Sequence, residues 1–335
     1  MNLGIGLANI LPVRDLVALS QHAERRGYHS VWITEATGAK DVITQMSAVA
    51  LATTAIRVAS GIIPIWTRTP IMLGASFLGL DELSDGRAIM GLGAGHPWAI
   101  RDFHGIEPTR AVARMRDTVA IAKLLFRQPH FSYDGPTARV VNYRRTVTPA
   151  RDDIPVYLAA LGPQMLRLAG QCADGVIMNA MTPAQIARAV ATVRDAARAA
   201  GRDPSRIVIG AYVLTCVHDD PAVALRVCRR MIANYARDPY YAAMLRDSGF
   251  GDTLDALAPA YAAGDLSAAA ALVPQHMAAA LALYGPAADC RRRLQPFLAA
   301  GLDLPVIHAF HPRSPDPVSS LRATIDALAP SAPPS

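Results

Sequence analysis

The sequence predicts a (β/α)8 barrel, an α/β fold in which eight parallel strands alternate with helices. Short apolar runs alternate with longer segments of helical periodicity, which is the pattern of βαβ units. Eight such runs can be counted along the chain. The length of 335 residues is also that of a barrel with insertions. Together these three observations favour a closed barrel over an open sheet.

The predicted strands are rich in apolar residues and are separated by helical or turn signals. They cover residues 3–8, 30–34, 57–60, 88–92, 154–159, 175–179, 207–215 and 305–308. Helices are expected at 12–26, 41–53, 70–83, 108–126, from 163, and at 317–328. Proline suits the first helical turn and glycine the helix end, as Pro12 and Gly27 do for the first helix.

Two segments interrupt this alternation. Residues 128–153 combine proline, glycine and β-branched residues, which indicates an inserted hairpin. Residues 219–284 are mostly helical and too long for one crossover, so a helical insertion is expected near 238–284. We expect one barrel domain over 1–329 and a disordered tail rich in proline and serine over 330–335.

Composition excludes several classes of protein. No apolar run reaches about 18 residues and no secretory signal begins the chain, so a membrane protein is not expected and a cytoplasmic enzyme is. The net charge of +6 comes from scattered arginines, since the only lysines are Lys40 and Lys123, and this argues against a nucleic-acid partner. Four cysteines without a C-x-x-C pair and nine histidines without an H-x-H or H-x-x-x-H pair predict no protein-bound metal.

The carboxyl ends of the predicted strands are mostly small or apolar. Barrel enzymes carry their active sites at these ends. Because the residues there are small or apolar, they favour a pocket for a flat, largely apolar ring. The run from Gly91 to His96 reads G-x-G-x-x-H. It follows the fourth strand, lacks the third glycine and is not followed at once by a predicted helix, so it is not a dinucleotide fingerprint. Its glycines are expected to let the backbone pass close to a ligand or a neighbouring strand.

The segment 160–164 joins a strand to a helix and places Pro163 at the first helical position. Free N–H groups at that helix start could hold a phosphate, although an ordinary strand–helix junction has the same form. Glu35 ends the second strand and could act as a general acid, a hydrogen-bond acceptor or a salt-bridging group. His96 and His308 suit a structural role better. The segment 68–70 is typical of a helix N-terminal cap.

At these residues the chain resembles luciferase-like oxidoreductases, especially the branch around methylene-tetrahydromethanopterin reductase. Five stretches carry the resemblance in the correct order. They are 27–35, 60–62 followed by 67–70, 80–87 leading into 91–93, 154–163, and 173–176.

The resemblance implies a barrel that binds coenzyme F420, or FMN in sister branches, at the strand ends. It also implies a non-prolyl cis peptide after the third strand, which falls on Gly61-Ile62 here. The implied cofactor contacts are Asn9, Ser60, Gly61, Ile62, Gly93, Ala94, Gly95, Ala160, Leu161, Gly162 and Pro163. Relatives of this kind usually form homodimers through helices beside the barrel.

One departure from the family pattern concerns catalysis. Several relatives have an acidic residue followed by a histidine after the second strand, whereas this chain has Glu35-Ala36. Either Glu35 takes the acid–base role, or the substrate needs only hydride transfer. The departure favours reduction of an imine-like or enone group in a small molecule, with Trp66 and His96 lining the substrate pocket.

Two other functions are compatible with the same sequence. An FMN-dependent monooxygenase would use this fold to activate oxygen. A cofactor-free barrel kept as a binding protein is the second, because the histidine at position 36 is missing. Binding of each cofactor to the purified protein separates the three.

Overall fold

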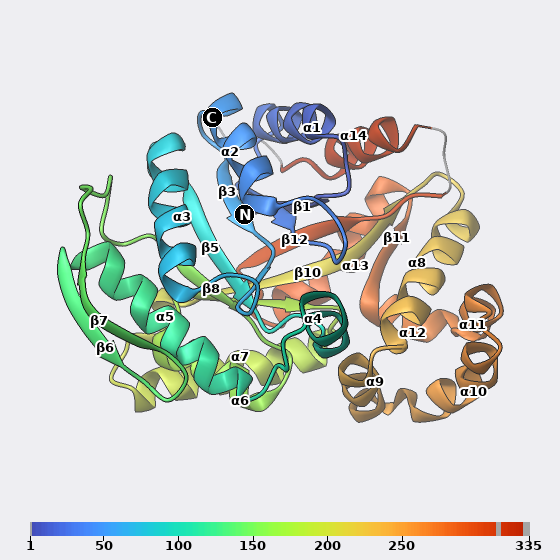
Figure 1. Ribbon diagram of the computed structural model, residues 1–335. Coiled ribbons are helices and arrows are strands. Elements are labelled where there is room, and N and C mark those ends of the chain that lie inside the picture. Colours follow the sequence, from blue (N-terminus) through green and yellow to red (C-terminus); the bar gives the residue numbers. More distant parts are fainter. Residues whose placement is uncertain (1, 313–315, 331–335) are drawn as a thin grey trace. The chain divides into compact units, whose positions relative to one another are not determined.

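The computed structural model describes residues 2–312 and 316–330. Within this part of the chain, eight parallel strands and the helices between them form a closed (β/α)8 barrel, and the predicted fold class is confirmed (Figure 1). The chain divides into two compact units, which are described separately. Unit 1 comprises residues up to Ile5, 178–191 and those from Ile209 onward, and unit 2 comprises 6–177 and 192–208.

The strands of unit 2 pair in parallel in the order β2-β3-β5-β8-β9. Trp32 is paired with Ala59, and Leu92 with Leu158. Their apolar runs are buried almost throughout, as expected for parallel strands covered on both faces. The strands, with β1 before them, are β1 (Gly4–Ala8), β2 (Ser30–Thr34), β3 (Arg57–Ser60), β5 (Ala88–Gly93), β8 (Val156–Ala159) and β9 (Gly175–Asn179), and the short β4 (Ile63–Pro64) pairs with β5.

The helices that follow these strands begin at local capping signals. The Asp41 side chain accepts a hydrogen bond from Thr44 N (2.9 Å) at the start of α2, and Thr69 caps α3 in front of Pro70. The expected cap around 68–70 is therefore present. The helices are α1 (Val13–Arg25), α2 (Val42–Ala52), α3 (Pro70–Leu83), α4 (Pro97–His104), α5 (Ala111–Arg127), α6 (Pro163–Cys172) and α7 (Pro183–Ala199).

A hairpin of β6 (His130–Asp134) and β7 (Arg139–Arg144) lies beside α5 (Figure 1). Asp117 of α5 is fully buried and accepts hydrogen bonds from the Tyr133 hydroxyl (2.8 Å) and Thr137 N (2.7 Å). Burial alone would raise the pKa of Asp117, but these hydrogen bonds outweigh it and lower the pKa below its usual value. The ionised carboxylate of Asp117 therefore helps to fasten the hairpin to α5.

In unit 1, β10 (Val208–Val217) lies between β11 (Ala282–Gly285) and β12 (Leu304–Ala309), and all three are parallel. Leu214 is paired with His308, and Cys216 with Tyr284. The segment between β10 and β11 is helical. It contains α8 (Pro221–Ala236), α9 (Pro239–Leu245), a π-helical turn (Arg246–Phe250), α10 (Gly251–Ala262), α11 (Leu266–Leu272) and α12 (Gln275–Leu281), and α13 (Ala287–Ala299) and α14 (Pro317–Leu328) complete the unit.

Three features differ from the sequence-based expectations. The helix α4 begins at Pro97, two residues after Gly95, where no immediate helix was expected. It has only eight residues, fewer than the ten to twelve over which a helical pattern can be told from other short segments. The strand β4 was also missed, because two residues are too few to give a strand pattern, and β11 was missed because its apolar run continues directly from the helix α12. The expected disorder beyond Pro330 concerns residues outside the described range and stays a prediction.

No helix in the described ranges is both long and apolar enough to cross a lipid bilayer. The histidine, cysteine, aspartate and glutamate side chains of the same ranges nowhere gather in threes close enough to hold a metal ion.

Candidate functional site

The candidate site lies at the carboxyl ends of the unit 2 strands, where the chain forms an uncharged ledge. Ile62 follows β3, and its side chain lies against Gly93 at the end of β5. A Cβ added to Gly93 would be 2.5 Å from Ile62 Cδ1 and 3.3 Å from the Cβ of Ala159 at the end of β8. Glycine at position 93 therefore makes room for the ledge, which we define as Ile62, Gly93 and Ala159. The Gly61–Ile62 peptide is cis, as the resemblance implied.

Ser60 and Gly91 contact each other next to the ledge and fix its backbone. The Ser60 hydroxyl donates to Gly91 O (2.8 Å) and accepts from Gly91 N (2.9 Å), so its hydrogen-bonding capacity is used within the protein. A Cβ at Gly91 would lie 1.9 Å from the carbonyl oxygen of Ser60. Only glycine fits at position 91 without displacing the backbone of the ledge.

Asn9, a predicted cofactor contact, is fully buried, and its side chain connects two loops. Its Oδ1 accepts from Ala36 N (3.0 Å), and its Nδ2 donates to the carbonyl oxygen of Lys40. The Lys40 ammonium in turn donates to Ile10 O (3.1 Å) and Leu11 O (3.2 Å). The side chain of Asn9 therefore links the loops after β1 and β2.

Glu35 is held by Arg68, a residue that the sequence analysis placed only in a helix cap. Arg68 Nη1 donates to Glu35 Oε2 (2.9 Å) and Nη2 to Oε1 (2.7 Å), and Nη2 also pairs with Asp41. The hydrogen bond to Glu35 raises the pKa of Arg68 above its usual value. Glu35 thus has both oxygens in a two-pronged ion pair that is mostly buried. No spacing rule points to this pair, because the two residues are 33 positions apart.

Trp66 and His96, the predicted substrate contacts, both adjoin the loop 93–95, Trp66 through a hydrogen bond and His96 as the next residue of the chain. Trp66 Nε1 donates to Ala94 O (2.9 Å), and the Arg114 guanidinium lies 5.6 Å above the indole ring. Trp66 therefore fixes the loop and is covered on one face. Gly95 has a positive φ of 69°. His96 is half-buried at the start of α4, with its ring 6.3 Å from that of Trp98.

The segment 160–163 leads into α6 and leaves the first turn of this helix open. Ala160 is buried, while Gly162 and Pro163 are exposed. Gly162 is the N-cap residue, no side chain caps the helix, and the first turn contains no acidic residue. A Cβ at Gly162 would meet no atom within 4 Å. The free backbone N–H groups here can receive an anion.

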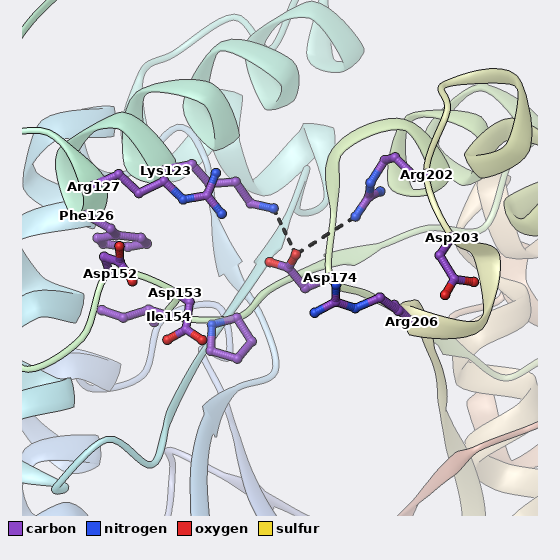
Figure 2. A pocket seen from close by; sticks show the side chains of 11 residues that line it. Lys123, Phe126, Arg127, Asp152, Asp153, Ile154, Asp174, Arg202, Asp203 and Arg206 are labelled. Carbon is purple, nitrogen blue, oxygen red and sulfur yellow. Dashed lines mark hydrogen bonds and ion pairs between the residues drawn. The ribbon is translucent and has the colours of Figure 1, made fainter.

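A cavity of about 460 Å³ in unit 2 lies elsewhere, beside the residues that precede β8 and β9. It is lined by Lys123, Phe126, Arg127, Asp152, Asp153, Ile154, Pro155, Asp174, Arg202, Asp203 and Arg206. Figure 2 shows that Lys123 and Arg202 both reach toward Asp174, at 2.9 and 3.9 Å. Lys123 and Arg202 also donate to carbonyl groups at the end of α6, so they are engaged in the structure. The amino ends of barrel strands are associated with stability and not with catalysis.

In unit 1, His308 and Asn179 are also at or near strand ends. His308 lies between Tyr212 and Phe310, with ring centroids 5.1 and 4.4 Å away, and burial lowers its pKa to about 4. The imidazole is therefore neutral at pH 7. Asn179 is the last residue of β9 and is hydrogen-bonded to Tyr241.

Comparison with known proteins identifies relatives of this chain by sequence and by fold. The chain is 29% identical over 305 residues to 5,10-methylenetetrahydromethanopterin reductase from Methanolobus tindarius, covering 90% of this chain and 92% of the relative. It is 26% identical to the enzyme of that name from Archaeoglobus fulgidus, with 96% and 97% covered. The solved structure of the coenzyme F420-dependent tetrahydromethanopterin reductase from Methanopyrus kandleri matches the fold with a TM-score of 0.88, at 22% identity and 98% coverage of both chains.

The family model described as luciferase-like monooxygenase matches residues 3–304, which is most of the chain. The resemblance identified from the five sequence stretches is therefore confirmed. The protein belongs to the luciferase-like monooxygenase family.

Proposed function

We propose that this protein is a coenzyme F420-dependent oxidoreductase that transfers a hydride between the deazaflavin and a small organic substrate. The observation that carries the proposal is the similarity, which covers 90% of this chain, to 5,10-methylenetetrahydromethanopterin reductase. Among possible substrates we favour an imine-like or enone group. The family description leaves an FMN-dependent monooxygenase as the second candidate.

The residues of unit 2 fit F420. Its flat ring system suits the ledge of Ile62, Gly93 and Ala159, which carries no charged side chain. Its phosphate-bearing tail suits the open first turn of α6, where Gly162 and Pro163 leave the backbone N–H groups uncapped. We propose that these residues, together with Gly61, Ala94, Gly95, Ala160 and Leu161, bind the cofactor, while Asn9 and Ser60 hold the backbone in place behind it.

Bound F420 would supply the hydride donor, so the chain needs only to position two rings and exclude water. We propose that Glu35 serves as a positioning carboxylate. Both of its oxygens already accept hydrogen bonds from Arg68, which makes it a poor proton donor. If the substrate is an iminium cation, its carbon accepts the hydride and the product is a neutral amine. No proton transfer is needed. The alternative in which the substrate needs no acid–base residue is therefore favoured, in agreement with alanine at position 36.

The test is turnover in the absence of oxygen. Reduced F420 is mixed with the purified protein and 5,10-methylenetetrahydromethanopterin, and oxidation of the deazaflavin is followed by absorbance. We expect one equivalent of oxidised F420 per equivalent of the methyl product. No oxidation of F420 in this assay, together with oxygen consumption when reduced FMN and air are supplied in a second assay, would instead favour the monooxygenase.

We also propose that the protein forms a homodimer through α2 and α3. The helix α2 contains no charged residue, and the two acidic residues of α3 are Asp81, buried against Arg151, and Glu82. Nevertheless, Leu51 and Met72 are 70% and 56% exposed. Helices that are apolar on all faces are normally covered. Apart from Glu82 near the end of α3, the two helices carry no exposed charge, so little like-charge repulsion opposes the contact of two copies of this surface.

Met72→Glu is expected to convert the dimer into a monomer, because it places a charge in an apolar interface. Light scattering after gel filtration would measure the change from twice 35.6 kDa to 35.6 kDa. Val141→Glu is the matched control, since Val141 is similarly exposed but belongs to β7. A monomeric wild-type protein, or a dimer in both variants, would contradict this interface.

All four cysteines are free thiols, which supports the cytoplasm as the compartment we propose.

A further inference from the structure

The cavity at the amino ends of β8 and β9 has the size of a small-molecule site and no part in the proposed function. Its volume of about 460 Å³ falls within the range of ligand pockets, roughly 300–1,000 Å³. All of its lining residues belong to unit 2. Pro155 precedes β8 whereas Ala159 ends it, and four residues of strand span about 13 Å. A molecule in this cavity would therefore be separate from the ledge at the other end of the same strand.

The inner part of the cavity contains more positive than negative charge. Asp174 Oδ1 lies 2.9 Å from the Lys123 ammonium and 3.9 Å from the Arg202 guanidinium. The other oxygen of Asp174 accepts a hydrogen bond from Val156 N (2.9 Å). One carboxylate thus serves two cations, and one positive charge is left in excess. An anion that enters the cavity therefore approaches a region that attracts it.

Two arginines at the rim have no partner of their own. Arg127 is the last residue of α5, and Arg206 is the last residue of the 3-10 turn Pro204–Arg206. Both side chains are exposed, and neither makes a hydrogen bond or an ion pair with the residues that the structure describes. Figure 2 shows them extending toward the middle of the cavity from its two sides. Because they come from different segments, they can hold two anionic groups of one molecule.

The lining also contains four carboxylates against its four cations, and most of these carboxylates are engaged. Besides Asp174, Asp153 lies 4.0 Å from Arg151, and Asp203 accepts hydrogen bonds from Ser205 N (2.9 Å) and Ser205 Oγ (2.7 Å). Asp152 is the one lining carboxylate without a partner in the described ranges. The groups left to meet a ligand are therefore the two rim arginines and this single aspartate.

We propose that the cavity binds a small dianion with two oxyanion groups, one held by Arg127 and the other by Arg206. Guanidinium groups bind phosphate and carboxylate groups through pairs of hydrogen bonds. Phe126 and Ile154 are buried and give the cavity an apolar floor for the middle of such a molecule. The ligand would connect the end of α5 with the segments before β8 and β9. Since it binds only the folded chain, it would also raise the temperature of unfolding.

The experiment titrates the full chain with pyrophosphate and, separately, with succinate, at constant ionic strength so that general screening stays the same. Isothermal titration measures the affinity. We expect one saturable site per chain, with a dissociation constant below about 1 mM for at least one probe. The probe that binds more tightly identifies the oxyanion group as phosphate or carboxylate. Absence of saturable binding of both probes overturns the proposal.

Three variants change the charge of the rim. Arg127→Gln and Arg206→Gln are each expected to weaken binding by about tenfold or more, because each removes charge-assisted hydrogen bonds. Asp152→Asn is expected to strengthen binding by about threefold, because it removes a like charge beside the ligand. All three residues are exposed, so the variants should fold, and thermal unfolding without ligand checks this.

Arg14→Gln is the matched control. Arg14 is an exposed arginine of α1 without a partner in the described ranges, and its loss lowers the net charge by the same amount. Wild-type affinity in this control, together with weaker binding in the two rim variants, supports the site. Equal affinities in all four proteins, or an equal loss in Arg14→Gln, overturn it.

Gly162→Asp separates this site from the start of α6, where the phosphate of F420 is proposed to bind. Probe binding that persists in Gly162→Asp supports the cavity, whereas its loss there would assign the probe to α6 and overturn the inference. Unchanged F420 affinity in Arg127→Gln and Arg206→Gln is the further expected result. A wild-type protein that binds no F420 contradicts the proposed function alone, because the titration with the two anions does not depend on the cofactor.

Discussion

Gly91→Ala is expected to lower the free energy of unfolding by about 3 kcal/mol and to abolish F420 binding. The added Cβ would lie 1.9 Å from the Ser60 carbonyl oxygen, a distance that real structures do not show. The neighbouring atom belongs to the backbone, so rotation of a side chain cannot relieve the overlap. Either β5 or the segment 60–62 has to move, and both of them support the ledge.

Urea unfolding measures the stability of this variant, and F420 fluorescence measures its binding. Gly251→Ala is the matched control, since a Cβ there would meet only Arg246 Nη1 at 3.7 Å and the residue begins α10. We expect this control to be as stable as the wild-type protein or slightly more stable, because alanine favours helices. If Gly91→Ala unfolds at the wild-type urea concentration and binds F420 normally, the ledge does not require glycine.

Gly162→Asp is expected to weaken F420 binding by about 100-fold while leaving the protein folded. An aspartate at this N-cap position would accept hydrogen bonds from the first turn of α6, as Asp41 does for α2 and Asp220 for α8. Its carboxylate would occupy the donors proposed for the cofactor phosphate and would repel that phosphate as well. Capping itself stabilises a helix by a few tenths of a kcal/mol relative to glycine.

Gly162→Asn separates capping from charge, because its side-chain oxygen can accept the same hydrogen bonds without a net charge. We expect the asparagine variant to bind F420 with an affinity between those of the wild-type and aspartate proteins. Isothermal titration gives all three dissociation constants. Wild-type affinity in Gly162→Asp would show that the phosphate binds somewhere other than the start of α6.

The fold could be predicted because the barrel repeats one local pattern. The strands 30–34 and 57–60 and the helix 70–83 have the bounds expected from apolar runs, proline and glycine. The segment 97–104 was missed because eight residues are too few for a helical pattern to stand out. Local patterns also cannot reveal pairings between distant residues, and tertiary packing alone brings them together.

The candidate site was only partly predictable for the same reason. The open start of α6 follows from the segment 160–163, because the whole motif is contiguous. The roles of Asn9 and Ser60 in holding backbone groups were not foreseen, since their partners Lys40 and Gly91 lie about 30 residues away. Arg68 was assigned to a cap, and its pairing with Glu35 depends on how two loops meet. A single sequence contains no signal for that contact.

The central claim is that this barrel uses a deazaflavin, and its most direct test is a titration of the purified apoprotein with coenzyme F420 and, separately, with FMN. Fluorescence reports binding of either one. We predict tight binding of F420 and no measurable binding of FMN at the same concentration. Binding of FMN alone would contradict the claim and favour the monooxygenase, and binding of neither would favour a barrel that works without a flavin.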